Sequence, residues 1–226
     1  MRVAMLAFPD MTQLDFTGPH EVFSRFKELA IDIVWKKPGV IDVGGGLQFL
    51  TSTTYDNCPQ ADILFVPGGA GQFALMDDQE TLTFLRRQAE KAQYITSVCT
   101  GSLVLAASGL LTGYRATCHW ASLNQLAYFD AEPVAERVVI DRNRITGAGV
   151  TSGIDFALTL VGQIFGEERA KRTQLFMEYD PEPPFPGGSP KSSDPALVAE
   201  ARNMMAGFQV KREEAARKAA NLLKRP

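Results

Sequence analysis

The sequence has few of the side chains that bind metals or form disulfides. Its 226 residues include three cysteines, Cys58, Cys99 and Cys118, and two histidines, His20 and His119. The cysteines are odd in number and widely spaced, without a CxxC pair, which argues against a disulfide framework or a structural zinc site. With no clustered carboxylates and no HxxxH spacing, a catalytic metal is also disfavoured. We therefore expect no metal, and a reducing cytoplasm as the location.

Strong net charge, long apolar runs and phosphate-binding loops are absent as well. A net charge of −3 gives no electrostatic reason to expect a nucleic acid or an anionic membrane as partner. The longest apolar runs, such as residues 103–107 and 156–161, are too short to span a bilayer, and residues 2–8 are too short for a signal peptide. No GxxxxGK(S/T) occurs, and the glycines at 44–46 are not followed by a helix, so phosphate-loop and dinucleotide sites are excluded.

Buried strands alternate with helices along most of the chain. We expect strands at residues 3–7, 31–35, 62–66 and 94–98, a hairpin of 138–140 with 144–146, and helices at 79–91, 101–107, 121–128 and 152–165. This alternation is typical of an α/β protein whose mostly parallel sheet has helices on both faces. At this length we expect one domain, spanning residues 1–226.

A long helix is expected near the end of the chain. Residues 180–194 are rich in Pro, Gly and Ser and form a loop, and the helix follows from about residue 195. Its apolar residues recur at near-helical spacing, with a polar gap around Lys211 and Arg212. We expect this stripe to pack on the parent domain; an arm in a dimer is the second interpretation. The stripe comprises Leu197, Ala201, Met204, Phe208, Ala215, Ala219 and Leu222.

Cys99 lies where a β-prone run, residues 94–98, ends and an apolar helical pattern led by Gly101 begins. A residue at such a turn is usually held in a strained backbone conformation, with its side chain above the carboxyl edge of the sheet. It also lies beside the free N–H groups of a helix, whose partial positive charge favours a thiolate. Cys99 is therefore a candidate nucleophile at a nucleophile elbow; the alternative is a small buried hydrophobic residue.

Two further segments are expected at the same edge, because reactive groups gather beyond the carboxyl ends of parallel strands. Asp15 follows the first strand between two apolar residues, and it is either a partner for Cys99 or a cap of the first helix. Beside Cys99, the two groups would share one proton and titrate as a unit. Gly68 and Gly69 follow the third strand. Either their N–H groups hold developing negative charge, or the two glycines form only a tight turn.

The residues next to the cysteines limit which types of cysteine active site the protein can have. Thr100, and not a histidine, follows Cys99, so an adjacent Cys-His peptidase pair is absent. His119, between Cys118 and Trp120, is either a base for Cys99 or a packed, hydrogen-bonded histidine, and the second interpretation is favoured.

Together these motifs resemble the ThiJ/PfpI superfamily, with its flavodoxin-like, class I glutamine amidotransferase-like fold. Within it they are most similar to the isonitrile (cyclohexyl-isocyanide) hydratases. The matching segments are 13–20 (QLDFTGPH), 66–69 (VPGG), 96–102 (TSVCTGS), 115–120 (RATCHW), 153–158 (GIDFAL) and 178–185 (EYDPEPPF). The elbow and the Pro-Gly-Gly turn specify the fold, whereas the first segment combined with Cys-Thr-Gly-Ser is more specific.

The resemblance implies that Asp15, Cys99 and Thr100 are catalytic. It implies hydration of an isonitrile to an N-substituted formamide without metal or organic cofactor, by a homodimer. We expect Cys99 to attack the isonitrile carbon while Asp15 protonates it, giving a thioimidate that Asp15 and water then hydrolyse. Thr100, Gly68 and Gly69 would hold the developing charge, and Phe16, His119 and Trp120 would line the pocket for the uncharged substrate.

Three alternatives remain. Similar motifs occur in the sensory domains of helix-turn-helix regulators. However, the single helix expected after the loop is too short for a two-helix DNA-binding unit, and the negative net charge is unfavourable for DNA binding. In a redox sensor, Cys99 would be oxidised and not used for turnover. A glyoxalase-type enzyme acting on methylglyoxal would use the same elbow.

Overall fold

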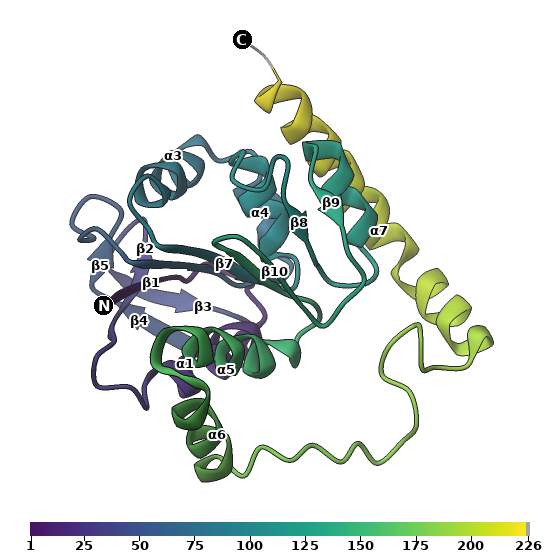
Figure 1. Ribbon diagram of the computed structural model, residues 1–226. Coiled ribbons are helices and arrows are strands. Elements are labelled where there is room, and N and C mark those ends of the chain that lie inside the picture. The colour runs from purple at the N-terminus through teal and green to yellow at the C-terminus, as the bar shows by residue number, and fades with distance from the viewer. Residues whose placement is uncertain (225–226) are drawn as a thin grey trace.

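The computed structural model describes residues 1–224, which form a seven-stranded sheet with helices on both faces (Figure 1). The strand order is β10-β11-β7-β6-β1-β2-β5, and all neighbours are parallel except the β10–β11 hairpin. The strands are β1 (Arg2–Leu6), β2 (Ala30–Trp35), β5 (Thr53–Thr54), β6 (Ile63–Val66), β7 (Tyr94–Val98), β10 (Val138–Asp141) and β11 (Arg144–Gly147). The four expected strands and the expected hairpin are therefore confirmed.

Two small sheets accompany the main one. An antiparallel hairpin joins β3 (Gly39–Asp42) to β4 (Gln48–Thr51), and β8 (Arg115–Ala116) pairs in parallel with β9 (Glu132–Pro133). The glycines at 44–46 form the turn of the first hairpin, where all three have positive φ angles. Such angles suit glycine because it has no Cβ.

Helices α1 and α5 lie against one face of the sheet, with α6 packed beside α5, and α3 and α4 lie against the other face (Figure 1). The α-helices are α1 (Gln13–Phe23), α2 (Gln72–Leu75), α3 (Gln79–Ala89), α4 (Gly101–Ala107), α5 (Ser152–Phe165), α6 (Glu167–Phe176) and α7 (Pro195–Leu223). The helix expected at 121–128 is instead a 3-10 helix, η1 (Leu123–Phe129). Its apolar residues Leu123, Leu126 and Phe129 are three apart, a spacing that puts them on one face of a 3-10 helix.

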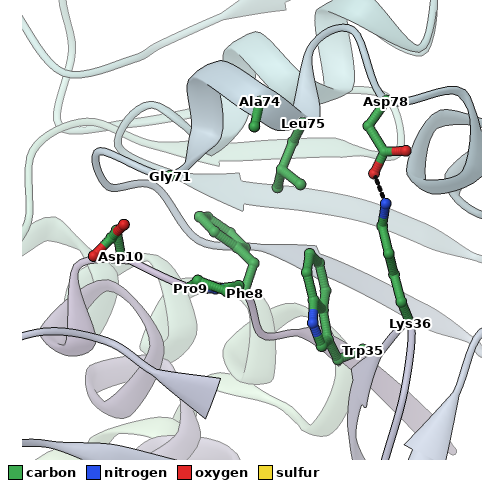
Figure 2. Close-up of a pocket in the computed structure, with 9 residues that line it drawn as sticks. All are labelled: Phe8, Pro9, Asp10, Trp35, Lys36, Gly71, Ala74, Leu75 and Asp78. Carbon is green, nitrogen blue, oxygen red and sulfur yellow. Dashed lines mark ion pairs between the residues drawn. The ribbon is translucent and has the colours of Figure 1, made fainter.

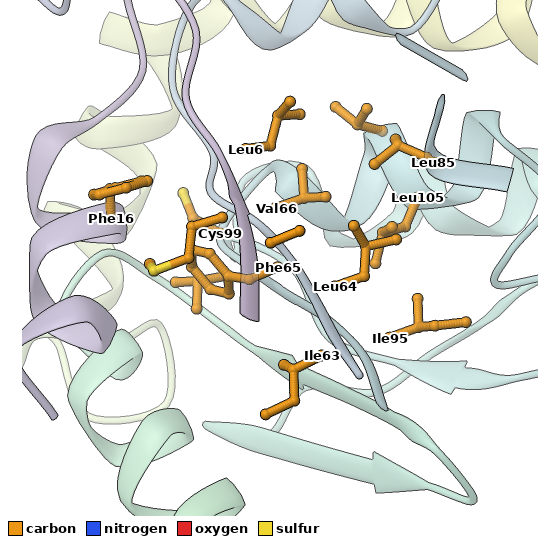
Figure 3. Packing of buried hydrophobic residues seen from close by; sticks show 14 of the residues in the cluster. Leu6, Phe16, Ile63, Leu64, Phe65, Val66, Leu85, Ile95, Cys99 and Leu105 are labelled. Carbon is orange, nitrogen blue, oxygen red and sulfur yellow. The ribbon is translucent and has the colours of Figure 1, made fainter. Parts of the chain in front are cut away.

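The core is centred on the middle strands. Every side chain of β6 is buried, as expected for a central strand with helices on both faces (Figure 3). Phe65 of β6 packs against Phe156 of α5 with ring centroids 5.7 Å apart, and Phe23 of α1 contacts both rings. This packing fixes α1 and α5 on the sheet, and thereby positions the residues that follow β1 and β7.

The buried residues of helix α7 all lie in its second half. Asp194 caps its start by accepting hydrogen bonds from the N–H groups of Ala196 and Leu197. Its buried residues are Arg212, Ala216, Ala219 and Ala220. Met204 of the expected apolar stripe is 81% exposed, so the prediction that the whole stripe packs on the domain is wrong. The first half extends beyond the sheet (Figure 1), and there the Arg202 guanidinium lies 4.9 Å from the centroid of the Trp120 ring.

Within residues 1–224, no helix is long and apolar enough to cross a membrane.

Candidate active site

Cys99 lies at a sharp turn between β7 and α4. Its φ angle of 57° is in the left-handed region, which is strained for a residue with a Cβ, and its N–H donates to the carbonyl of Gly147 at 3.0 Å. The chain comes close to the neighbouring strand here: a Cβ on Gly101 would lie 2.2 Å from the carbonyl oxygen of Val66. Glycine at 101 therefore permits the turn, and the elbow has the geometry expected from the sequence.

Hydrogen bonds of buried hydroxyl groups stabilise the turn at Cys99. The hydroxyls of Ser97 and Ser102 are 2.9 Å apart, and Ser102 donates to the carbonyl of Thr117 at 2.7 Å. These bonds tie β7 and α4 to the segment that carries Cys118. Buried polar groups that are satisfied in this way fix a unique backbone arrangement.

Asp15, in the first turn of α1, is fully buried and accepts a hydrogen bond from the N–H of Gly68 at 2.9 Å through Oδ2. The other oxygen, Oδ1, accepts no hydrogen bond from a backbone N–H or a hydroxyl group within residues 1–224. The carboxyl group interacts with the Cys99 thiol. It does not cap α1, which begins after Thr12 without a side-chain cap. The structure thus brings Asp15 and Cys99 together, and the capping interpretation is wrong.

Burial is the main influence on the pKa values of the Asp15 carboxyl group and the Cys99 thiol. It raises the pKa of Asp15 from 3.8 to about 7, although bonds from Cys99 and Gly68 oppose the change. Burial, and then the charge of Asp15, also raises the pKa of the Cys99 thiol well above 9.0, while the N–H of Thr100 lowers it. The expected effect of the helix terminus is present in the N–H of Thr100, but burial and the charge of Asp15 outweigh it. At neutral pH the thiol keeps its proton, and Asp15 titrates beside it.

The N–H groups of Gly68 and Gly69 are used within the protein. The first donates to Asp15, and the second donates to the Thr100 hydroxyl at 3.1 Å, which contacts the Gly69 carbonyl at 3.4 Å. The expectation that these groups face a ligand is not met, because each satisfies a buried side chain. They position Asp15 and Thr100 around Cys99.

The other candidate residues lie around this centre. Phe16 is buried on the same helix as Asp15 and contacts Phe49 of the β3–β4 hairpin, with centroids 5.2 Å apart. His119 accepts a hydrogen bond from the N–H of Ala121 at 3.3 Å, and burial lowers its pKa, so the ring is neutral. Its ring is 5.7 Å from that of Trp120. Among residues 1–224 His119 makes no hydrogen bond to Cys99, which favours the packed histidine.

A cleft of about 430 Å³ lies beyond the ends of β1 and β2 (Figure 2). Phe8 and Trp35 form its apolar floor, and an ion pair between Lys36 and Asp78 closes one side. None of the candidate catalytic residues lines it. The cleft is therefore separate from the elbow.

Within residues 1–224, no group of three or more His, Cys, Asp or Glu side chains is arranged to hold a metal ion.

One charged residue near the elbow was not among the candidates. Arg212 of α7 is buried, and it interacts electrostatically with the thiols of Cys118 and Cys99. The sequence showed it only as a polar interruption of an apolar stripe. Nothing in the spacing indicated what it faces.

Comparison with known proteins agrees with this fold. The model of the DJ-1/PfpI family matches residues 1–163. The chain belongs to the DJ-1/PfpI family. A solved ThiJ/PfpI family protein from Pseudomonas syringae superposes with a TM-score of 0.92 at 43% identity, covering 95% of this chain and 90% of that one. The resemblance and the fold inferred from the sequence are confirmed.

Two curated relatives of this DJ-1/PfpI protein belong to different functional classes, an enzyme and a transcriptional regulator. An isonitrile hydratase from Pseudomonas putida is 47% identical over 220 residues, covering 97% of this chain and 96% of the relative. The HTH-type transcriptional regulator GbdR from Pseudomonas aeruginosa is 38% identical over 137 residues, covering 60% of this chain and 37% of the regulator. The family model ends before α6, whereas the match to the hydratase extends across most of α7.

Proposed function

We propose that this DJ-1/PfpI protein is an isonitrile hydratase, which adds water to R–N≡C and releases the N-substituted formamide. The observation that carries the proposal is the buried pair of the Asp15 carboxyl and the Cys99 thiol at the elbow. The near-full-length similarity to an isonitrile hydratase supports the same reaction.

The first half of the reaction uses the shared proton. The terminal carbon of an isonitrile accepts both a nucleophile and a proton. The sulfur of Cys99 bonds to this carbon, its proton passes to Asp15, and Asp15 delivers the proton to the same carbon. The product is a thioimidate, R–N=CH–S–Cys99, and Asp15 is again a carboxylate.

The second half consumes water. Asp15 takes a proton from water as the water oxygen bonds to the thioimidate carbon, and it passes this proton to the nitrogen, so that Asp15 is again a carboxylate. The carbon–sulfur bond then breaks, the hydroxyl proton returns through Asp15 to sulfur, and R–NH–CHO leaves. Oδ1 of Asp15 suits this role because Oδ2 is held by Gly68, whereas Oδ1 has no such backbone bond.

We assign supporting roles to the surrounding residues. The N–H of Thr100 stabilises charge on the Cys99 sulfur, and its hydroxyl is fixed by Gly69. Phe16, Trp120 and neutral His119 are proposed as the uncharged wall of the substrate pocket. No metal or organic cofactor is needed, because the reaction is complete with the thiol, the carboxyl group and water.

Incubation of the protein with cyclohexyl isocyanide and, separately, with methylglyoxal tests the proposal. We expect N-cyclohexylformamide from the first and no lactate from the second, each followed by chromatography. Lactate without formamide would instead indicate a glyoxalase-type enzyme. Stoichiometric Cys99 sulfinate after mild peroxide, with no isonitrile turnover, would indicate a redox sensor.

The activity is expected to fall on the acid side of about pH 7. Since the thiol keeps its proton, Asp15 must be a carboxylate to accept it, and the pKa of Asp15 is about 7. Below this pKa, kcat/KM should decrease about tenfold per pH unit as the acceptor is lost. Initial rates of formamide formation between about pH 5 and 9 measure this. A flat profile would show that Asp15 is not the proton acceptor.

Substitution of Gly68 by alanine tests the pair's geometry. The added Cβ would lie 2.5 Å from the Thr100 nitrogen and 2.9 Å from Oδ2 of Asp15, so these groups must move apart. We expect kcat to fall at least about tenfold, because misplaced catalytic groups lose near-attack geometry. The free energy of unfolding should fall by about 1–3 kcal/mol.

The control for this substitution is Gly207→Ala, in the middle of α7, where a Cβ meets no atom within 4 Å. It should leave kcat unchanged, with stability equal to the wild type or up to about 1 kcal/mol higher. Full activity of Gly68→Ala would contradict the proposed role of the Asp15–Cys99 contact.

We further propose that residues 1–226 form one domain, that the protein is a cytoplasmic homodimer, and that it binds neither nucleic acid nor membrane. Exposed apolar side chains on the β3–β4 hairpin, Val40, Leu47 and Leu50, support a partner surface. The three cysteines are free, which is compatible with a reducing compartment. Light scattering after size-exclusion chromatography measures the mass in solution and decides the oligomeric state.

A further inference from the structure

The turn at residues 119–122 carries His119 and Trp120, two of the residues proposed as the substrate wall. The N–H of Ser122 donates to the His119 carbonyl at 2.8 Å, and the N–H of Ala121 donates to Nδ1 of the His119 ring at 3.3 Å. These two bonds close the turn and orient the ring. The position of the wall therefore depends on what holds Ser122 and Trp120.

The turn lies beside the elbow. A hydrogen bond of 2.7 Å from α4 to the Thr117 carbonyl ties the segment before the turn to the elbow helix. A Cβ built on Gly149 would lie 3.7 Å from Cδ2 of His119, which is an ordinary contact distance. Two residues earlier, the Gly147 carbonyl accepts the N–H of Cys99 at 3.0 Å. The turn therefore borders the segment that holds the nucleophile.

Helix α7 holds the other end of the turn through polar contacts. Oε1 of Gln209 accepts a hydrogen bond from the Ser122 hydroxyl at 2.9 Å and a second from the Gln125 amide at 3.3 Å. Nη1 of Arg212 donates to the same Ser122 hydroxyl at 3.0 Å. Ser122 and Gln125 are buried, so these bonds satisfy polar groups that would otherwise be costly to bury.

A further contact from α7 restrains Trp120. The guanidinium of Arg202 lies 4.9 Å from the centroid of this ring, and a cation at that distance is attracted to the indole face. Trp120 is half-buried, and Arg202 is exposed. Arg202 and Gln209 are about two helical turns apart, so both lie on the face of α7 that meets the turn.

Helix α7 is itself anchored to α2. Phe208 packs against Phe73 with ring centroids 4.8 Å apart, and Nε of Arg212 donates to Oε1 of the fully buried Gln72 at 3.0 Å. The helix is thus fixed to the body of the protein next to Gln209, and it provides a firm support for the turn.

An isonitrile makes different demands at its two ends. Its terminal carbon reacts at Cys99 beside Asp15, whereas the R group of a substrate such as cyclohexyl isocyanide is a hydrocarbon. Because the C–N≡C unit is linear, the R group lies in line with the reacting carbon and away from the sulfur. The ring surfaces of His119 and Trp120 suit such a group. A displaced wall would change the fit of R and leave the thiol–carboxyl contact in place.

We propose that α7 determines substrate specificity: Gln209 and Arg202 hold the turn at residues 119–122 as a wall against the R group, so that isonitriles with a bulky hydrocarbon R group are favoured. This inference rests on the proposed function. Gln209 and Arg202 are positioning residues, because they act through Ser122 and Trp120.

Substitutions of Gln209 test the proposal. Gln209→Met removes the shared acceptor at similar size, and KM for cyclohexyl isocyanide should rise about three- to tenfold with kcat changed less than about twofold. KM for methyl isocyanide should change less than about twofold, since a methyl group covers little of the wall. Gln209→Glu keeps the acceptor and should retain both wild-type KM values. Chromatography of the two formamides measures the rates.

Substitutions of Arg202 test the contact with Trp120. Arg202→Gln removes the cation and should raise KM for cyclohexyl isocyanide about two- to fivefold, whereas Arg202→Lys keeps the cation and should stay near the wild type. The matched control is Lys211→Gln, which removes a charge from an exposed position of α7. It should leave KM for both isonitriles unchanged.

A measurement without isonitrile follows the support directly. The sequence has two tryptophans, so Trp120 is the remaining one in a Trp35→Phe background. Acrylamide quenching of its fluorescence should increase about twofold in Gln209→Met and in Arg202→Gln, and should not change in Gln209→Glu. The rate of Cys99 alkylation by iodoacetamide should be the same in all these proteins, because the elbow is intact.

The outcomes separate a specificity role from a structural one. If Gln209→Met leaves both KM values unchanged, lowers kcat for both isonitriles by the same factor, or leaves the quenching of Trp120 as in the parent, the inference is wrong. Loss of selectivity that Gln209→Glu does not restore would also contradict it. If the wild-type protein forms neither formamide, the proposed function is wrong and the specificity role is lost with it. Quenching distinguishes the two failures, because it reports the α7 contact whether or not an isonitrile reacts.

Discussion

Replacing Cys99 with alanine is expected to abolish formamide formation, with a loss of at least about four orders of magnitude in kcat. The other thiols cannot replace it, because the carboxyl group of Asp15, which takes the thiol proton, is hydrogen-bonded to Cys99, whereas burial raises the pKa of Cys118 to about 12 and that of Cys58 to about 11. The fold should persist, because alanine has the same Cβ as cysteine and adopts the same backbone angles at similar cost. Product chromatography and circular dichroism measure the two effects.

Cys58→Ala is the matched control for this experiment. Cys58 is buried, and its thiol donates a hydrogen bond to the Pro59 carbonyl at 3.4 Å. Its removal should leave kcat unchanged. Appreciable turnover by Cys99→Ala would show that the nucleophile is another group.

Asp15→Asn should lower kcat by at least about two to three orders of magnitude, because the reaction loses the group that moves protons between sulfur, carbon and water. The amide can still accept the hydrogen bond from Gly68, so the backbone geometry is kept. The matched control is Asp155→Asn, in the first turn of α5, where the carboxylate pairs with Arg137 at the surface. This control should keep full activity.

The Asp15→Asn variant is also expected to be more stable than the wild type above about pH 7. The pKa of Asp15 rises from 3.8 to about 7 on folding, so the folded state binds the proton more tightly than the unfolded state. Stability is therefore lost as pH rises from about 4 to 7, by on the order of 4 kcal/mol. Asparagine does not titrate and avoids this loss.

Urea unfolding of both proteins between about pH 4 and 9 measures the difference. The two unfolding free energies should be closest at the acid end and diverge with increasing pH. An Asp15→Asn protein that is less stable than the wild type at about pH 8 would contradict the raised pKa of the carboxyl group.

The elbow could be predicted from the sequence because its determinants are local. A β-prone run, a cysteine and a glycine-led helix are contiguous, and the close approach of Gly101 to Val66 explains why glycine is present. The central strands were found for a similar reason: they are short apolar runs bounded by turn residues.

The protonation of the pair could not be predicted, because burial depends on residues far apart in the sequence. Asp15 is buried beside Gly68 and the elbow, and burial of the pair outweighs the effect of the helix terminus on Cys99. The use of the Gly68 and Gly69 N–H groups likewise depends on side chains from other segments. Arg212 interrupts an apolar stripe, but its contacts with Gln72 and Ser122 span 140 and 90 residues.

The strand order affects how the protein acquires its reactivity during synthesis. Asp15 follows β1, Cys99 follows β7, and β6 lies between these two strands in the sheet. Before the sheet forms, Asp15 is a solvated acid and Cys99 is an ordinary thiol. The paired chemistry arises only when β6 joins its two neighbours and Gly68 binds the acid, so reactivity and native topology appear together.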